Sequence, residues 1–347
     1  MAMKSYVDVT VLYLKTDLDR RWPGMKWQHY EEEGVSTIEV TIGRSPVPKT
    51  SFITWQIQLY RAIGKVIEEI GRPDILHAQD DNSWVVGYYA RKHNIPYVIS
   101  QHWTKVTGNR LTFLEKKFYK RAFKSASAVL PAHYNAEGEY RKIGLESTVR
   151  WLPNVYDPKL FYPSTLKREK TLVHVSGFTQ QKRVDDILAA FSLVLKEEPS
   201  AQLILIGDGP GAKYYIDKAQ SMLPSESFQF KGFLPKLEIG HELQQTSGFV
   251  FPSSFETFGC VLLEAMACGT PVLTTRVGGI PGIVPDEKHG ILVDVGNIEQ
   301  IKTGMIKMLR GTHGLDLDQI QREVHKKFSY RAVGEQLEKI YQKVLEI

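Results

Sequence analysis

Residues 249–279 read FVFPSSFETFGCVLLEAMACGTPVLTTRVGG, and this stretch decides the fold. It opens with an apolar run that predicts a short buried strand, which PSS at 252–254 ends in a loop. Apolar residues at helical spacing follow from position 261, and GTP at 269–271 ends that helix before a second apolar run at 272–275. The stretch therefore predicts a strand, a loop, a helix and a parallel strand, which is the repeating unit of an α/β fold.

The loop before this helix predicts a phosphate-binding site. N–H groups at a helix N-terminus lack partners and carry a partial positive charge, so the backbone from Thr257 through Phe258 to Gly259 is suited to an anion. Gly259 also lets a ligand approach closely. Glu256 precedes the site, and Glu264 follows Glu256 by eight residues, about two helical turns. Carboxylates accept hydrogen bonds from sugar hydroxyls, so the pair indicates a nucleotide-sugar, with hydroxyls at both ends of a diphosphate.

Each glutamate taken singly has a simpler explanation, because a Glu at a helix start often complements the dipole and a Glu inside a helix is often solvated. The surrounding sequence favours binding. PSxxETFG from 252, EAMAxGTPV from 264 and VGG at 277–279 closely resemble the Glu-x7-Glu signature of the retaining family-4 glycosyltransferases. The resemblance implies an α/β fold of the GT-B class, in which two Rossmann-like domains face a cleft.

Length and composition agree with a two-domain globular protein, since 347 residues exceed one ordinary core. The sequence contains no apolar run that could span a bilayer and no signal-peptide core. Cys260 and Cys268 would lie about 12 Å apart on one helix, too far for a disulfide, which suggests inert core thiols in a reducing compartment. We therefore expect a cytoplasmic protein. The net charge of +5 is mild, and no nucleic-acid-binding signature accompanies it, so no nucleic-acid partner is expected.

The domain organisation follows from the resemblance. We expect an N-terminal, acceptor-side Rossmann-like domain at 1–157 and a C-terminal, nucleotide-sugar-binding one at 158–330, with a final helix at 331–347 that packs back on the first. Members of the family begin with a strand, a glycine-containing loop and a helix, whereas only six residues precede the strand predicted at 7–14 here. The first βα unit of the N-terminal domain is therefore predicted to be missing.

The resemblance also assigns a site residue in the first domain. IPYVISxH resembles the family's strand that ends in the active-site His, and it places His102 just past the strand predicted at 96–100. A His at such a place is otherwise often a structural hydrogen-bonding group. We expect His102 to position the donor sugar or the acceptor.

Three further residues are assigned in the second domain. Lys182 matches the Lys that the family gives to the donor diphosphate, but Gly177 stands where an Arg is usual, and Arg183 is expected to compensate. Two cations at a helix start are unfavourable for the dipole, which favours a phosphate partner over a merely solvated helix start. Gly207, after the strand predicted at 201–206, resembles the loop beside the nucleotide.

Residues 105–124 form a basic amphipathic segment, KVTGNRLTFLEKKFYKRAFK. The ordinary interpretation is a surface helix with a solvated basic face. The alternative is peripheral contact with an anionic membrane at its inner face, because many members of the family glycosylate lipid-linked acceptors.

The sequence as a whole predicts an enzyme that transfers a sugar from a nucleotide-diphosphate sugar to an acceptor hydroxyl with retention of configuration. The catalytic residues would be His102, Lys182 and Glu256. The acceptor would be a saccharide or a lipid-linked group in glycan, lipopolysaccharide or glycolipid synthesis. No cofactor and no metal are expected, since neither Asp17-x-Asp19 nor Asp316-x-Asp318 ends a convincing strand. The alternatives are a GT-B phosphorylase or epimerase, and a nucleotide-sugar-binding protein that is inactive without the missing βα unit.

Overall fold

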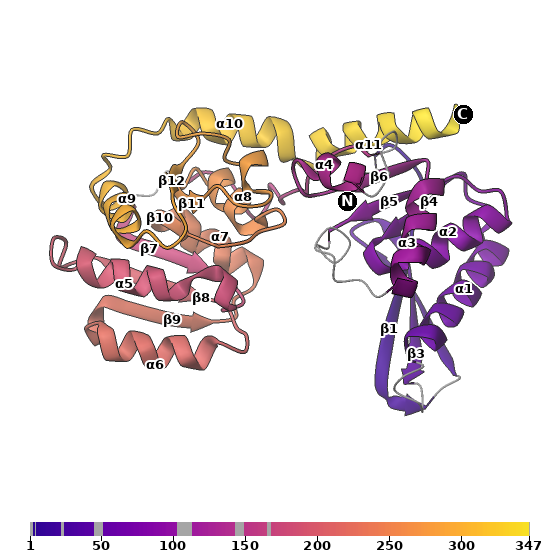
Figure 1. Ribbon diagram of the computed structural model, residues 1–347, viewed down its shortest axis with the longest axis horizontal. Coiled ribbons are helices and arrows are strands. Elements are labelled where there is room, and N and C mark those ends of the chain that lie inside the picture. Colours follow the sequence, from indigo (N-terminus) through magenta and orange to yellow (C-terminus); the bar gives the residue numbers. More distant parts are fainter. Residues whose placement is uncertain are drawn as a thin grey trace. The chain divides into compact units, whose positions relative to one another are not determined.

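The computed structural model describes residues 3, 5–21, 24–44, 51–102, 113–142, 149–164 and 168–346 (Figure 1). The chain forms two compact units. Unit 1 comprises residues 1–152 together with 333–347, and unit 2 comprises residues 153–332. The sequence predicted the division at 157, and it predicted that the returning segment starts at 331.

The described residues of unit 1 form two three-stranded sheets. The first has the order β1-β3-β2, with β1 (Thr10–Arg21) parallel to β3 (Val35–Arg44) and β2 (Met25–Glu32) antiparallel to β3. The second is parallel and has the order β4-β5-β6, with bounds Leu76–Gln79, Tyr97–Gln101 and Ala128–Pro131. Strand residues alternate between two faces, so Leu12 and Leu14 of β1 lie against the core.

The helices of unit 1 cover these sheets. They are α1 (Ser51–Ile70), α2 (Ser83–Lys92), α3 (Phe113–Ser125), α4 (Ala136–Lys142) and most of α11 (Tyr330–Leu345). Side-chain hydrogen bonds join α11 to other parts of the unit. The hydroxyl of Tyr341 lies 2.6 Å from Nδ1 of His77, and Nε2 of Gln336 donates to the carbonyl of Trp151 at 2.8 Å.

Unit 2 is built on one parallel sheet of six strands in the order β12-β11-β10-β7-β8-β9. The strands are β7 (Glu169–Val175), β8 (Gln202–Ile206), β9 (Phe228–Gly232), β10 (Thr246–Phe251), β11 (Val272–Thr275) and β12 (Ile291–Val293). The helices are α5 (Val184–Val194), α6 (Ala212–Met222), α7 (Lys236–Gln245), α8 (Cys260–Ala267), α9 (Ile298–Arg310) and α10 (Leu317–Phe328).

The core of unit 2 explains why this sheet forms. Apolar strand residues such as Leu172, Leu203 and Val250 pack with the apolar faces of α5, α6 and α9 in one buried cluster. Helix α8 contacts β10, β11 and α10. A parallel sheet covered by helices buries its strands on both faces, so its strands are continuous apolar runs in the sequence. The strands of unit 2 agree with the apolar runs from which they were predicted.

The elements differ from the sequence prediction in four places. The strand predicted at 7–14 begins at Thr10 and continues to Arg21, so the Asp17-x-Asp19 segment lies in a strand after all. Neither β2 nor α6 was predicted. The basic helix expected within 105–124 is described from Phe113 to Ser125, and residues 103–112 lie outside the described part of the chain.

Candidate functional site

The predicted donor residues lie where the sheet of unit 2 changes direction. β7 and β10 are neighbours, and the strands after β7 extend to one side while those after β10 extend to the other. Open parallel sheets bind ligands outside the carboxyl ends of their strands at such a switch point. The loop after β7 carries Lys182, and the loop after β10 carries Glu256. A hydrogen bond of 2.8 Å from the N–H of Ser254 to the carbonyl of Gln181 joins the two loops.

Two glycines, Gly278 and Gly279, pack against the backbone of the loop after β10. The N–H of Gly279 donates to the carbonyl of Glu256 at 3.0 Å. A Cβ on Gly278 would lie 1.9 Å from that carbonyl oxygen, and a Cβ on Gly279 would lie 1.9 Å from the carbonyl oxygen of Thr257. Only glycine permits this approach, so the Val-Gly-Gly at the end of the fold-deciding stretch positions Glu256 and Thr257.

The start of α8 offers backbone donors. Its N-cap is Gly259, whose φ of 98° is in the left-handed region. Glycine has no side chain with which to cap the helix, so the first N–H groups of α8 are open to an anion. The ring of Phe258 is buried and packs edge-on against Phe328 of α10, with ring centroids 6.1 Å apart. Phe258 can therefore contribute only its backbone to a ligand.

Glu256 and Lys182 form an ion pair across the two loops. Both are largely buried, with 9% and 23% of their side chains exposed. The Lys182 ammonium also lies 4.9 Å from the ring centroid of Phe251 at the end of β10, in reach of a cation–π interaction. The structure thus places a cation and a carboxylate together at the switch point, both on short loops anchored to central strands.

Glu264 lies on α8 and is 8% exposed. Its partner is Lys236 at the start of α7, with 3.4 Å between Nζ and Oε1, and Lys236 is 67% exposed. Burial raises the pKa of Glu264, and the nearby Lys236 only partly opposes this shift. A buried carboxylate with one solvated partner retains acceptor sites for hydroxyl donors.

Cys260, the first residue of α8, and Cys268, the C-cap of the same helix, are free thiols. Cys268 is buried, as expected, but Cys260 is exposed, so the prediction that both are core thiols is wrong for Cys260. The reason is its position in the first turn of α8, beside Asn154, whose Nδ2 lies 3.4 Å from Sγ.

Arg183 and Gly207 lie beyond the carboxyl ends of the neighbouring strands β7 and β8. Arg183 is the N-cap of α5 in the left-handed conformation, and its guanidinium makes two bonds to Asp186, of 2.6 and 2.9 Å. Gly207 follows β8 with φ of 130°, and a Cβ there would lie 1.9 Å from the carbonyl oxygen of Ser176. Gly207 therefore lets the loops after β7 and β8 touch, while Arg183 has an internal carboxylate partner.

His102 belongs to unit 1, at the end of β5. It is exposed, its N–H donates to Oδ1 of Asp80 at 2.6 Å, and its Nε2 lies 3.3 Å from Oε1 of Gln79. Asp80 has φ of 45°, an uncommon conformation that Asp tolerates. No pattern in the sequence predicts a role for Asp80 or Lys236, or the contacts of Gly278 and Gly279.

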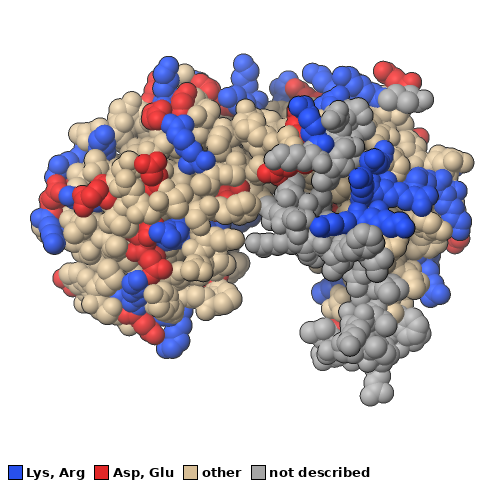
Figure 2. Space-filling view, viewed as in Figure 1, with Lys and Arg blue, Asp and Glu red and all other residues tan. Residues whose placement is uncertain are grey.

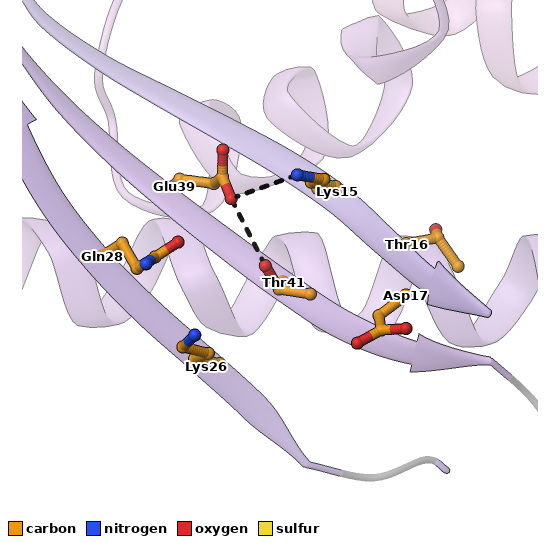
Figure 3. Close-up of a pocket in the computed structure, with 7 residues that line it drawn as sticks. All are labelled: Lys15, Thr16, Asp17, Lys26, Gln28, Glu39 and Thr41. Atoms are coloured by element: carbon orange, nitrogen blue, oxygen red, sulfur yellow. Dashed lines mark hydrogen bonds and ion pairs between the residues drawn. The ribbon is translucent and has the colours of Figure 1, made fainter. Parts of the chain in front are cut away.

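A second polar feature lies on the first sheet of unit 1 (Figure 3). Side chains from β1, β2 and β3 line a depression of about 390 Å³: Lys15, Thr16, Asp17, Lys26, Gln28, Glu39 and Thr41. Glu39 pairs within it, 3.8 Å from Lys15 and 3.4 Å from the hydroxyl of Thr41. Opposite charges balance on this exposed face, and none of the predicted site residues belongs to it.

Metal-ligand clusters and membrane-spanning helices are both absent from the described part of the chain. Within it, no group of three or more His, Cys, Asp and Glu side chains is arranged to hold a metal ion. None of the helices described is both long enough and apolar enough to cross a membrane.

Comparison with known families identifies the chain. The family model described as "Glycosyl transferases group 1" matches residues 141–331, and that described as "Glycosyltransferase Family 4" matches residues 5–160. The first covers more than half of the chain. The chain therefore belongs to the group 1 glycosyltransferases, which confirms the resemblance carried by residues 249–279.

Curated relatives share part or most of the chain. N-acetyl-alpha-D-glucosaminyl L-malate synthase of Bacillus anthracis is 33% identical over 179 residues, which are 51% of this chain and 46% of the synthase. The uncharacterized glycosyltransferase MJ1607 of Methanocaldococcus jannaschii is 24% identical over 91% of this chain and 87% of its own. The chain thus spans about half of the synthase and most of MJ1607.

Solved structures show the same fold. Sucrose-phosphate synthase from Thermosynechococcus elongatus superposes with a TM-score of 0.75 at 20% identity, covering 99% of this chain and 90% of the other. HepE of Anabaena, solved in complex with UDP, gives 0.73 at 17% identity, covering 87% of this chain and 86% of the other. These similarities confirm the predicted GT-B class of fold.

Proposed function

We propose that the protein transfers a sugar from a nucleotide-diphosphate sugar to an acceptor hydroxyl, with retention of configuration and without an essential metal. One observation carries the proposal. The uncapped start of α8 lies at the switch point of a six-stranded sheet, with the Glu256–Lys182 pair on one side and Glu264 about one turn along the helix. A solved structure with the same fold, HepE, is in complex with UDP, which favours a nucleotide-sugar donor here.

The nucleoside end of the donor would bind Glu264. Its carboxylate accepts hydrogen bonds from the two ribose hydroxyls, and its only close cation, among the residues described, is the solvated Lys236. Charge-assisted hydrogen bonds of this kind are stronger than neutral ones. Gly207, at the end of the neighbouring strand β8, is assigned to the same nucleotide; its N–H donates to the carbonyl of Gly232 at 2.7 Å, and a side chain there would collide with Ser176.

The diphosphate would bind the backbone of Thr257, Phe258 and Gly259 together with Lys182. Cations and amides placed in advance stabilise the negative charge that develops on a departing diphosphate, which lowers the barrier. Arg183 is assigned to the same anion, and it would then share its guanidinium with Asp186.

Glu256 would hold the donor sugar and the positive charge that develops on it. Its carboxylate is already fixed by Lys182, and its backbone carbonyl accepts the N–H of Gly279. His102, at a strand end of unit 1, would position sugar or acceptor. Retention then proceeds on one face of the sugar, because the site residues include no carboxylate assigned as nucleophile.

The acceptor would be a saccharide or a lipid-linked group at an anionic membrane surface. Helix α3 presents five exposed cationic side chains, namely Lys116, Lys117, Lys120, Arg121 and Lys124. Figure 2 shows Lys and Arg gathered on this face of unit 1. Phe118 is 48% exposed among them, and its ring lies tilted against Trp84, with 5.1 Å between ring centroids. Basic residues around an exposed aromatic ring suit anionic lipid. Flotation with vesicles that contain anionic lipid, lost for Lys117→Glu with Lys120→Glu, would support this contact, and equal flotation of both proteins would exclude it.

Calorimetric titration with UDP, GDP and ADP, in EDTA, tests the donor site. We expect one nucleotide to bind without metal, and the corresponding nucleotide-sugars then serve as donors for transfer. A phosphorylase would instead require inorganic phosphate, and an epimerase would act without an acceptor. If none of the three nucleotides binds, the proposal fails.

A further inference from the structure

His174 lies in β7, the central strand beside the switch point, and its side chain is fully buried. Both ring nitrogens have partners. Nδ1 lies 2.8 Å from the carbonyl oxygen of Val250 in β10, and Nε2 lies 2.8 Å from the hydroxyl of Ser176. The buried imidazole therefore joins three parts of unit 2 by hydrogen bonds. They are β7, which carries it, β10 and the loop that follows β7.

The partners determine the tautomer. A carbonyl oxygen only accepts, so Nδ1 carries the proton and donates to Val250. Nε2 is then an acceptor, and the hydroxyl of Ser176 donates to it. The Ser176 oxygen in turn accepts the N–H of Phe178 at 3.1 Å. One chain of directed hydrogen bonds therefore runs from β10 through His174 to the backbone of the loop.

This loop is packed against the loop after β8 with no space for a side chain. A Cβ on Gly209 would lie 2.2 Å from the carbonyl oxygen of Gly177, and one on Gly211 would lie 2.1 Å from that of Phe178. Phe178 is itself buried and has φ of 48°, which is uncommon outside glycine. A small shift of residues 176–178 would therefore displace both loops.

His174 also contacts the Phe251 ring on which the Lys182 ammonium lies. Its ring stacks on Phe251 with an interplanar angle of 29° and 6.0 Å between centroids, and the Lys182 ammonium lies 4.9 Å from the same Phe251 ring. Lys182 is at the end of the loop that begins at Ser176. The same histidine thus supports Lys182 through the Phe251 ring and through the backbone.

We propose that His174 is a positioning residue for the donor diphosphate, which acts through Ser176 to hold the loop that carries Lys182. The inference rests on the proposed donor site. The role is specific to the diphosphate, because the ribose carboxylate Glu264 lies on α8, outside this hydrogen-bond chain. Loss of the chain should weaken diphosphate binding and leave nucleoside monophosphate binding unchanged.

Two substitutions at His174 separate its two hydrogen bonds. His174→Asn keeps a donor near the position of Nδ1 but has no atom that reaches Ser176. His174→Gln keeps an acceptor near the position of Nε2. Ser176→Ala removes the same link from the other side, with little change in volume, and serves if the His174 variants fail to fold.

The test is calorimetric affinity for the nucleoside diphosphate that the wild type binds, beside the matching monophosphate. We expect His174→Asn and Ser176→Ala to lose about tenfold in diphosphate affinity, the scale of one hydrogen bond, and to bind the monophosphate like the wild type. His174→Gln should stay within about threefold for both. An unchanged diphosphate affinity, or equal losses for both nucleotides, would overturn the inference. A wild type that binds no nucleoside diphosphate would overturn the proposed function as well.

Discussion

Glu264→Gln should weaken nucleotide binding without lowering the free energy of unfolding. In the free protein, the Glu264 carboxylate is 8% exposed and its partner Lys236 is 67% exposed. An ion pair with such a solvated partner contributes at most about 1 kcal/mol, whereas burying a carboxylate costs several kcal/mol. The raised pKa of Glu264 agrees that burial outweighs the attraction of Lys236. Removing the charge with an isosteric amide should therefore leave the free energy of unfolding unchanged or raise it by about 1 kcal/mol.

The same substitution should weaken nucleotide binding. A glutamine keeps one acceptor oxygen but replaces the other by a donor and loses the charge. Hydrogen bonds to charged groups contribute about 1.5–3 kcal/mol and neutral ones about 0.5–1.5 kcal/mol. With two ribose hydroxyls the loss should be about 2–3 kcal/mol, or about 30- to 150-fold in affinity.

Urea unfolding and calorimetric titration measure the two effects, and Glu242→Gln is the matched control. Glu242 lies on α7 and pairs with Lys231 of β9 at 2.5 Å, not with Glu264 or Lys236. The control should lose up to about 1 kcal/mol of stability and bind nucleotide normally. A raised pKa means that the Glu264 penalty is present near neutral pH and disappears as the pH falls through the folded-state pKa, so the stability gain of Glu264→Gln should shrink towards acid pH. Wild-type nucleotide affinity in Glu264→Gln would refute this reasoning.

Three other predictions concern catalysis, packing and pH. Lys182→Ala should lower turnover by about 10²–10³, the scale of one lost stabilising donor, and unchanged turnover in a folded protein would refute its role. Gly279→Ala, whose Cβ would lie 1.9 Å from the Thr257 carbonyl oxygen, should cost about 1–3 kcal/mol in urea unfolding and weaken nucleotide binding, whereas Gly138→Ala, with nothing within 4 Å, should do neither. Burial lowers the pKa of His174 to about 4. As the pH falls, the unfolded chain therefore protonates this imidazole before the folded protein does, and the free energy of unfolding should decrease by up to about 3 kcal/mol between pH 6.5 and pH 4. In His174→Asn, which has no imidazole at this position, the decrease measured over the same pH range should be smaller.

The apolar pattern of the sequence was sufficient for most elements of unit 2, because a parallel sheet buries continuous runs that stand out from their loops. The elements it missed have weak patterns. Strand β2 is exposed along its second half, and α6 carries polar residues on most of its turns. Periodicity measures burial, so an element with one narrow buried face is easily overlooked.

The site could be predicted only where its residues are close in sequence. Glu256, Gly259 and Glu264 fall in one stretch, but Lys236 reaches Glu264 from another helix, and Gly278 and Gly279 contact Glu256 and Thr257 through the turn of the chain after β11. His174 stands in an apolar strand, where a pattern alone indicates core. Its role depends on the neighbouring order of β7 and β10, which no local motif records.

The central claim is that the start of α8 holds the diphosphate of a nucleotide-sugar. A crystal structure of the protein with the nucleoside diphosphate it binds most tightly tests this directly. The account predicts phosphate oxygens within hydrogen-bond distance of the N–H groups at the start of α8 and of Lys182, with ribose hydroxyls on Glu264. A nucleotide bound elsewhere, for example in the polar depression on β1, β2 and β3, or one whose phosphates point away from α8, would contradict it.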